Sequence, residues 1–324
     1  MEDMRNVANE PKEVPVYLFT GFLDGGKSSF IQSLFEEEEF NAGEKTLLLL
    51  CEEGEVEYEP DKFIKPGVDI VTIEEQYELS EKHLSQLMAE GDYERVVIEY
   101  NGMWGLDLLY SAMPEGWLIY QEMLMIDGST FMAYNTNMRN LVYDKLKSVE
   151  TVVFNRLDRD TDKMPFHQII RAANRRCEII YEYGPDEMEF DEIEDPLPFD
   201  IDAPIVDIKE KDFAHWYRDI IEEEDKYYGK TIRVMGRSLL DGGLDKDEFV
   251  IGRHIMTCCV EDIQFGGLVA KYEDSQSLEH GGWVIMTAKV HCEYNKMYGE
   301  PGPVFHVIEV EKCDKPENEV ATFY

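Results

Sequence analysis

The sequence predicts an α/β domain, with a mainly parallel sheet and helices on both faces, followed by a small β-barrel domain. In the first part of the chain, short apolar runs alternate with amphipathic helical stretches, as in repeated strand–helix–strand units. After Gly229, strand-like runs follow one another across glycine-bearing turns, which is typical of small barrels. A glycine-rich loop between the first apolar run and the first helical stretch adds a phosphate-binding signature to the first domain.

Short apolar runs predict the strands of the first sheet. They lie at 16–19, 46–50, 68–73, 95–98, 123–126, 151–154 and 178–181. Helical stretches between them include 81–88, for which Ser80 is the expected N-cap, and 137–147. The first domain is therefore expected to span residues 1–185.

An acidic, proline-containing segment separates the two predicted domains. Residues 186–195 are mostly Asp and Glu, and prolines continue to Pro204, so 186–208 is expected to be a linker. The second domain, 209–324, begins with a helix whose predicted apolar face is formed by Phe213, Trp216, Tyr217, Ile220 and Ile221. Antiparallel strands of an OB-like barrel are then predicted at 230–235, 249–260, 267–272, 283–293 and 304–311.

The charge of the chain excludes some partners. The 324 residues carry a formal net charge of −38, whereas binding of nucleic acid or of an anionic membrane needs a basic surface. The sequence has no secretory leader pattern and no apolar run of about 18 residues. These features favour a cytoplasmic protein without direct membrane insertion. The 6 cysteines are too scattered for a secreted disulfide framework.

The loop after the first apolar run has the spacing of a phosphate-binding loop. Its glycines let backbone N–H groups close around a β-phosphate. Lys27 is expected to reach the β- and γ-phosphates, and the Ser28 hydroxyl to bind Mg²⁺. The predicted phosphate-binding set is Gly21, Asp24, Gly25, Gly26, Lys27, Ser28 and Ser29. The pattern predicts a P-loop NTPase fold, and the alternative is a glycine turn before an ordinary helix.

Two further segments are expected to complete the phosphate end of the site. Glu99 ends an apolar run, where it could hold Mg²⁺ together with Ser28, and the N–H of Gly102 could approach a γ-phosphate. Residues 51–55 follow the second predicted strand, where they could meet the γ-phosphate and the metal. The candidate catalytic residues are therefore Lys27, Glu52, Glu55 and Glu99.

The segment Asn155-Arg156-Leu157-Asp158 predicts guanine recognition. Many GTPases use Asn-Lys-x-Asp after a strand, because the Asp carboxylate accepts from donors of guanine that adenine lacks. Arg156 replaces the usual Lys, and its aliphatic stem could still cover the base. Asn155, Arg156 and Asp158 are the predicted base-binding residues for GTP or GDP. The alternative is a strand end followed by a polar turn.

These motifs give the chain, to about residue 185, a resemblance to the CobW-like family of P-loop GTPases, which includes metallochaperones for zinc, cobalt or nickel. The family's loop reads Gly-Phe-Leu-Gly-x-Gly-Lys-Thr/Ser, which is similar to residues 21–28. Its Asn-Glu-Phe-Gly-Glu, Glu-x-x-Gly and Asn-Lys-x-Asp motifs are similar to residues 51–55, 99–102 and 155–158. The resemblance implies a GTPase in metal homeostasis or transport.

The chain departs from this family at two further places. Asp24 puts a carboxylate beside the phosphates, where it would repel them or require an additional cation. The family's metal-carrying Cys-x-Cys-Cys is expected near 74–78, which reads Glu-Glu-Gln-Tyr-Glu. Because thiols are missing, soft-metal capture by the family's route is not expected. The stretch is either an acidic surface loop or a set of oxygen ligands for a harder cation.

From about residue 199, the chain resembles the soluble C-terminal domain of uncharacterised bacterial proteins that are encoded beside a predicted membrane permease. The matching residues are Tyr228-Gly229-Lys230, Gly252-Arg253, Met256 to Asp262, and Gly267-Leu268. The resemblance implies a fold and a metal or transport context. A protein partner or a membrane permease is therefore expected at this domain.

A cysteine pair in this domain predicts a transition-metal site, with zinc among the candidates. The candidate ligands are Cys258, Cys259, His254 and Cys292, or His291 in place of Cys292. Adjacent residues of a strand point to opposite faces, so the alternative is one core cysteine and one partly exposed cysteine. Acidic residues outnumber basic ones after Gly229, so the barrel is not expected to bind oligonucleotides.

Together these features predict a Mg²⁺-dependent GTP-binding protein with slow hydrolysis, which acts as a nucleotide-controlled switch. Two alternatives stay open. One is a degenerate P-loop scaffold or metal-binding module with little or no hydrolysis. The other is a kinase or ATPase of the same loop class.

Overall fold

The computed structural model describes residues 13–52, 54, 56–184, 187–240, 242–257 and 260–323, apart from the side chain of Glu261. The chain divides into two compact units between Ile193 and Glu194. This division lies within the stretch 186–208 that was expected to be a linker. Each unit has its own apolar core, which is the defining property of a domain.

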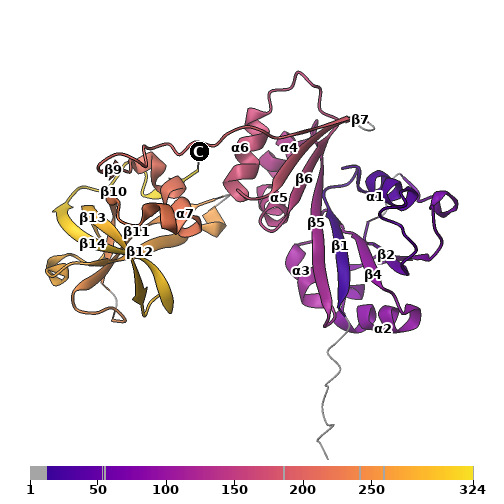
Figure 1. Ribbon diagram of the computed structural model, residues 1–324, viewed down its shortest axis with the longest axis horizontal. Helices are drawn as coiled ribbons and strands as arrows, with labels where there is room; N and C mark the ends of the chain where they lie inside the picture. The colour runs from indigo at the N-terminus through magenta and orange to yellow at the C-terminus, as the bar shows by residue number, and fades with distance from the viewer. Residues whose placement is uncertain are drawn as a thin grey trace, which may run out of the picture. The chain divides into compact units, whose positions relative to one another are not determined.

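The first unit is built on an eight-stranded sheet with the strand order β3-β2-β4-β1-β5-β6-β7-β8 (Figure 1). All neighbours are parallel except β8, which runs antiparallel to β7, so the sheet is mixed. Strands lie at every predicted position, and β8 was not predicted. The strands are β1 Val14–Thr20, β2 Thr46–Leu50, β3 Val68–Thr72, β4 Arg95–Glu99, β5 Trp117–Asp127, β6 Thr151–Asn155, β7 Glu178–Gly184 and β8 Glu187–Phe190.

Helices cover both faces of this sheet. Because side chains alternate along a strand, Leu18 packs in the core under α2 and α3, whereas its neighbour Phe19 packs under α1. Ser80 caps α2 as expected, with its Oγ accepting from the N–H of His83 at 3.4 Å. The helices are α1 Lys27–Glu36, α2 Glu81–Gly91, α3 Leu106–Ala112, α4 Phe131–Asn137, α5 Arg139–Leu146 and α6 Met164–Ala173, with 3₁₀ turns η1 Pro60–Lys62 and η2 Gln76–Glu78.

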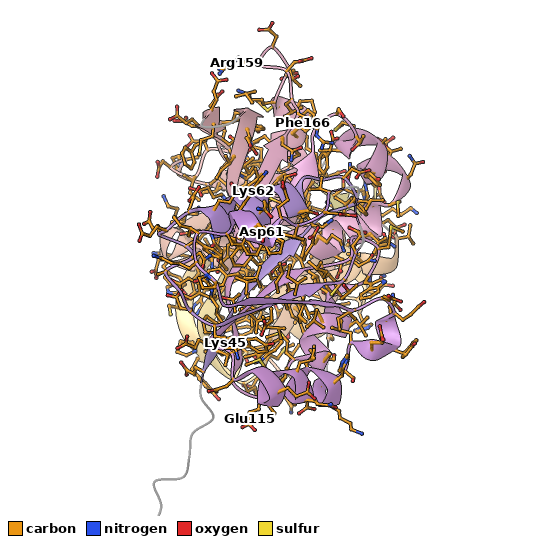
Figure 2. The ribbon with its side chains drawn as sticks, turned by 90° about the vertical axis from the view of Figure 1, so that its right-hand side faces the viewer. Lys45, Asp61, Lys62, Glu115, Arg159 and Phe166 are labelled. Atoms are coloured by element: carbon orange, nitrogen blue, oxygen red, sulfur yellow. The ribbon has the colours of Figure 1, made fainter. Side chains whose placement is uncertain are left out.

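The direction of the parallel strands sets where a ligand can bind in this unit. Lys45 and Glu115 precede β2 and β5, and Figure 2 shows them near one end of the unit, with Arg159, which follows β6, at the opposite end. The loops after β1, β2, β4 and β6 therefore meet at the carboxyl edge of the sheet. This is the edge where open α/β sheets bind their ligands.

The second unit contains a seven-stranded sheet and one α-helix, among the residues described there. Its strands are β9 Val206–Asp207, β10 Thr231–Leu239, β11 Glu248–Met256, β12 Gln264–Lys271, β13 Gly282–Asn295, β14 Glu300–Lys312 and β15 Val320–Thr322. The helix is α7 Phe213–Glu222, and the 3₁₀ turns are η3 Glu210–Asp212, η4 Glu224–Tyr227, η5 Val260–Asp262 and η6 Ser275–Ser277.

The five long strands of this unit correspond to the five predicted runs, and each pairs with two others of the set. The pairs β10–β11, β11–β12, β10–β13 and β13–β14 are antiparallel. The pair β12–β14 is parallel, which differs from the purely antiparallel arrangement that was expected. The short strands β9 and β15 add to β10 and β11.

The helix α7 packs on this sheet through most of the predicted face. Phe213, Trp216 and Ile220 are fully buried in the core of the second unit. Ile221 was expected on the same face but is 49% exposed. Asp219 takes the inward position instead, where it accepts a hydrogen bond from the hydroxyl of Tyr227. Among the helices of the described residues, none is long and apolar enough to cross a membrane.

Candidate nucleotide site

The loop between β1 and α1 has the backbone conformation that its glycines predict. Gly21 and Gly26 have φ values of 135° and 91°, which a side chain at Cβ would strain. A Cβ at Gly21 would also lie 2.1 Å from the carbonyl oxygen of Met125, and one at Gly26 would lie 2.5 Å from Nδ2 of Asn155. The loop backbone therefore lies so close to a carbonyl group of β5 and to the Asn155 side chain of β6 that only glycine fits at these positions.

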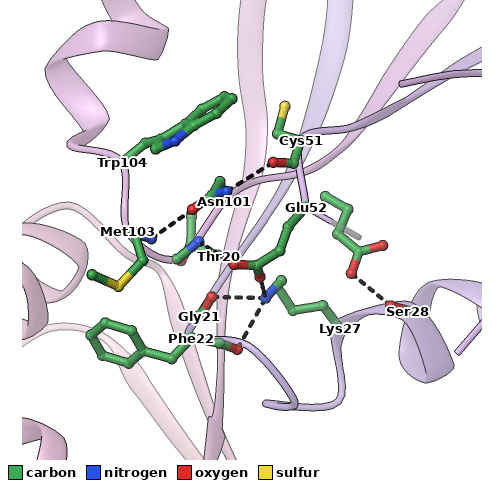
Figure 3. Close-up of polar contacts among 12 residues, drawn as sticks. Thr20, Gly21, Phe22, Lys27, Ser28, Cys51, Glu52, Asn101, Met103 and Trp104 are labelled. Atoms are coloured by element: carbon green, nitrogen blue, oxygen red, sulfur yellow. Dashed lines mark hydrogen bonds and ion pairs between the residues drawn. The ribbon is translucent and has the colours of Figure 1, made fainter. Parts of the chain in front are cut away.

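Lys27, the first residue of α1, turns its side chain back over the loop (Figure 3). Its Nζ donates to the carbonyl oxygens of Gly21 and Phe22 at 2.8 and 3.0 Å. It also forms an ion pair of 2.6 Å with Oε2 of Glu52, and the two side chains are only 3% and 10% exposed. The other carboxylate oxygen of Glu52 accepts from the backbone N–H of Gly102 at 3.3 Å.

The predicted metal ligands lie next to this ion pair. The hydroxyl of Ser28 donates to Oε1 of Glu99 at 2.7 Å, and Glu99 is buried at the end of β4. The hydroxyl of Tyr58 donates to Oε2 of the same carboxylate at 2.5 Å. Burial and the charge of Glu99 raise the pKa of Tyr58, so it remains a hydrogen-bond donor. Sequence reasoning missed Tyr58, since no local motif marks a tyrosine 41 residues from its partner.

The loop after β6 lies against the phosphate-binding loop. Nδ2 of Asn155 donates to the carbonyl oxygen of Gly25 at 2.8 Å. Arg156 has φ 56°, and its guanidinium pairs with Oδ2 of Asp127 at 2.9 Å. Burial alone would raise the pKa of Asp127, but hydrogen bonds from Ser129 and Arg156 lower it. Asp158 is exposed in the turn that follows.

One pocket collects most of the predicted residues. Its lining is Leu23, Asp24, Gly25, Gly26, Lys27, Ser28, Ser29, Glu52, Gly54, Val56, Glu99 and Arg156. Gly21, Gly102, Asn155 and Asp158 are outside this lining, although Gly102 approaches the loop so closely that a Cβ there would lie 2.6 Å from the carbonyl oxygen of Gly21. Glu55 lies outside the described residues.

The donor chemistry of the pocket fits a hard cation. Ser28 Oγ and a Glu99 carboxylate oxygen are adjacent oxygen atoms, which Mg²⁺ prefers as ligands. The nearby thiol of Cys51 is buried, and this burial together with the charges of Glu99 and Glu52 raises its pKa to about 12. Ser28 and Glu99 could therefore hold Mg²⁺ next to a phosphate.

The stretch 74–78, where the family resemblance would place thiols, is a capped turn. Oε2 of Glu78 accepts from the backbone N–H groups of Glu74 and Glu75 at 2.9 and 3.0 Å. Among the residues that the structure describes, no group of three or more His, Cys, Asp or Glu side chains is placed to hold a metal ion. The Glu78 carboxylate thus caps the turn.

The residues predicted as metal ligands in the second unit are only partly described. Cys258 and Cys259 lie outside the described residues, and β11 ends before them, at Met256. The ring of His254 contacts Phe265, and Cys292 is an exposed free thiol. The ring of His291 is tilted by 37° relative to that of His306, at a centroid distance of 4.2 Å. The strands β11 and β13, which carry His254 and Cys292, do not pair with each other. The metal site in this unit stays a prediction.

The second unit is similar to a domain of a known protein family. Residues 190–321 match the family model described as the DUF1980 C-terminal domain. This confirms the expected resemblance of the C-terminal part of the chain to a domain of uncharacterised proteins. No curated protein matches the chain.

Several solved structures are similar to this chain. The Zn(II)-bound YjiA GTPase from E. coli is 17% identical, with a TM-score of 0.40, and the match covers 75% of this chain and 86% of that chain. The hydrogenase maturation factor HypB from Archaeoglobus fulgidus is 16% identical, with a TM-score of 0.39, over 52% of this chain and 81% of that chain. FlhF complexed with GMPPNP and Mg²⁺ is 13% identical, with a TM-score of 0.36, over 56% and 71%.

Proposed function

We propose that this chain is a Mg²⁺-dependent guanine-nucleotide-binding protein with slow GTPase activity, which acts as a nucleotide-controlled switch. The observation that carries the proposal is the arrangement around Lys27. The Lys27 ammonium group and the Ser28 hydroxyl, from the loop and the start of α1, lie in one pocket with the Glu99 carboxylate from the end of β4, at the carboxyl edge of the parallel strands. Those are the three groups that a P-loop needs for a phosphate–magnesium ligand.

Each of these groups has a defined task in the proposal. Lys27 and the N–H groups of the loop would neutralise charge on the β- and γ-phosphates. Ser28 and Glu99 would hold Mg²⁺, which neutralises phosphate charge when it is bound. Glu52 and Glu55 are the candidates for orienting a water molecule. Because positioning and charge neutralisation are the main contributions, intrinsic turnover is expected to be slow.

Guanine selection is assigned to the loop after β6. Asp158 is exposed there, so its carboxylate is accessible to a ligand and could accept from the guanine donors. Asn155 holds the phosphate-binding loop through Gly25, which links the base end of the site to its phosphate end. The side chain of Arg156 lines the same pocket as Lys27, which supports its proposed place beside the nucleotide.

Calorimetric titration with GTP and with ATP, both with Mg²⁺, tests this function. We expect GTP to bind more tightly than ATP, and Asp158→Ala to remove that preference. Asp160→Ala is the matched control, since it removes an exposed acid two residues away. Absence of GTP binding contradicts the proposed function as a whole. An unchanged preference in Asp158→Ala contradicts the assignment of guanine recognition.

The second candidate function is a P-loop scaffold with little or no hydrolysis. The observation that favours it is Asp24, which lines the pocket and has φ 60°, so that a carboxylate stands beside the expected phosphates. Asp24→Asn removes the charge but keeps a residue that tolerates this conformation. A large gain in GTP affinity for Asp24→Asn means that Asp24 impairs nucleotide binding in the wild type, which supports the scaffold. An unchanged GTP affinity favours the nucleotide-controlled switch.

For the second unit, we propose an OB-like barrel that binds a protein partner, in metal homeostasis or transport. The closed series of pairings among β10, β11, β12, β14 and β13 supports the barrel. The strongly acidic chain favours a partner with a basic surface. Elemental analysis of the purified wild type and of Cys258→Ser tests the proposed site for zinc or another transition metal. The proposal requires that the wild type contains bound metal and that Cys258→Ser has lost it.

A further inference from the structure

The carboxylate of Glu52 is bound by two donors from different parts of the first unit. One is Nζ of Lys27, at 2.6 Å from Oε2, and the other is the backbone N–H of Gly102, at 3.3 Å from Oε1. In a P-loop site, the lysine ammonium is a donor to the β- and γ-phosphates. Gly102, at the end of β4, is the backbone group that was assigned to the γ-phosphate. Glu52 therefore bridges the two groups that a terminal phosphate would bridge.

The ammonium group of Lys27 has no donor left over in this arrangement. A lysine has three N–H donors, and Nζ bonds Glu52 and the carbonyl oxygens of Gly21 and Phe22. The pair is almost completely buried. A phosphate that takes a hydrogen bond from Lys27 must therefore replace one of these three acceptors. Among them, only the carboxylate of Glu52 is negatively charged, as a phosphate is.

We propose that Glu52 occupies the place of the terminal phosphate in the nucleotide-free site, and so makes the site discriminate between nucleoside triphosphates and diphosphates. The inference rests on the proposed nucleotide-binding function. The β-phosphate of a diphosphate can replace the carbonyl oxygen of Gly21 or Phe22 on Lys27, and it does not reach Gly102. Glu52 therefore keeps Gly102 and one donor of Lys27 when a diphosphate is bound. A triphosphate displaces the carboxylate, because two anions cannot share these donors at hydrogen-bond distance.

Two described residues that follow Glu52 in the chain lie at the metal half of the site. Tyr58, six residues after Glu52, donates to Glu99, and a Cβ at Gly54 would lie 3.7 Å from Oγ of Ser28. Displacement of Glu52 by a terminal phosphate therefore takes place close to the residues that contact Ser28 and Glu99.

Calorimetric affinities of the full chain for GMPPNP and for GDP, at one Mg²⁺ concentration, test the inference in the wild type and in Glu52→Gln. The variant removes the charge that competes with phosphate, and a charge-assisted hydrogen bond corresponds to a factor of about ten or more in affinity. We expect Glu52→Gln to bind GMPPNP about tenfold more tightly, with the GDP affinity changed less than about threefold.

Two further variants separate the contact from general effects. Glu52→Asp keeps the charge but shortens the side chain by one methylene, so it weakens the contact with Lys27 and is expected to tighten GMPPNP binding selectively. Glu59→Gln removes an exposed acid that pairs with Lys62 and is expected to change neither affinity. Circular dichroism spectra establish that each variant is folded.

The outcomes distinguish the inference from the function beneath it. A selective gain for GMPPNP supports the inference. An equal gain for both nucleotides, or no gain for GMPPNP, overturns it and leaves nucleotide binding standing. If the wild type and Glu52→Gln, both folded, bind neither nucleotide, the proposed function falls, and the inference falls with it.

Discussion

Nδ2 of Asn155 donates a hydrogen bond of 2.8 Å to the carbonyl oxygen of Gly25, across 130 residues of sequence. The contact joins the loop after β6 to the loop after β1, and a side chain at Gly26 would collide with the same amide. Asn155 therefore supports the phosphate-binding loop from the side where a base would bind. This position separates the role of Asn155 from that of Asp158, although both belong to one motif.

Asn155→Ala is expected to weaken GTP and ATP binding by similar factors. The substitution removes a hydrogen bond that supports the phosphate-binding loop and leaves contacts with the base unchanged. The loss of one partly buried hydrogen bond should also lower the free energy of unfolding by about 1 kcal/mol. Calorimetry and urea denaturation measure the two effects. Asn137→Ala is the control, since the Asn137 side chain donates within its own helix, to the carbonyl oxygen of Ala133. A loss restricted to GTP would instead assign Asn155 to the base.

Lys27→Met is expected to destabilise the nucleotide-free protein, because it leaves the buried carboxylate of Glu52 without its cation. Breaking a buried ion pair from one side costs about 3 kcal/mol. Glu52→Gln in the same chain should restore part of this, so the double variant should lose less than the sum of the single losses. Urea denaturation of the four proteins gives the coupling free energy. Additive losses would show that the pair does not act as a unit.

Gly102→Ala is expected to lower the free energy of unfolding by about 1–3 kcal/mol, the range for inserting an atom into a packed site. Its Cβ would lie 2.6 Å from the carbonyl oxygen of Gly21 and 2.6 Å from Cα of Phe22, which are backbone atoms of the loop. Gly184→Ala is the control, since a Cβ there would have no heavy atom of the described residues within 4 Å, apart from its chain neighbours. Equal stability of the two variants in thermal denaturation would contradict the close approach.

Lys145 is expected to make stability rise with pH on the alkaline side of neutrality. Its side chain is fully buried on α5, and burial lowers its pKa from 10.5 to about 8. Between these two values the unfolded chain binds more protons than the folded chain, so the free energy of unfolding rises with pH. From about pH 7.5 to 9.5 the gain should be about 2 kcal/mol.

Lys145→Met provides the control for this titration, since it removes the ionisable group and keeps an apolar stem. The difference between wild type and variant isolates Lys145 from the other ionisable groups of the chain. Urea denaturation at several pH values measures both proteins. Parallel pH profiles would show that Lys145 does not titrate in this range.

The fragment 1–193 is expected to unfold at a higher temperature than the fragment 1–185. Asp191 is buried and accepts from Tyr181 at 2.8 Å, from the N–H of Ile193 at 2.9 Å and from His167 at 3.0 Å. The shorter fragment loses these bonds and β8, at a cost of about 3 kcal/mol or more. The variant Asp191→Ala in the fragment 1–193 measures how much of this stability difference comes from the Asp191 carboxylate. Equal melting temperatures would place the boundary at residue 185.

The strands of both units were predictable because their signals are local. An apolar run such as 151–154 is by itself evidence for a buried strand. The residues 14–28 contain a strand, a loop and the start of a helix within one short stretch. The strand β8 was missed because its alternation of acidic and apolar residues covers only four positions within a mostly acidic stretch, and all four are exposed. Ile221 was placed on the wrong face because helical periodicity does not predict where along α7 the buried face ends, and Ile221 lies next to the last residue of the helix.

The sequence by itself determined that a glycine loop with Lys27 and Ser28 stands between a buried strand and a helix, since the spacing of neighbouring residues carries that information. Only the tertiary structure decided what Lys27 contacts. Its partner Glu52 is 25 residues away, and Tyr58 reaches Glu99 across 41 residues. Such contacts depend on the pairing of β1, β2 and β4 in one sheet, which brings their carboxyl ends together. A local sequence pattern does not predict which distant residues this pairing brings together.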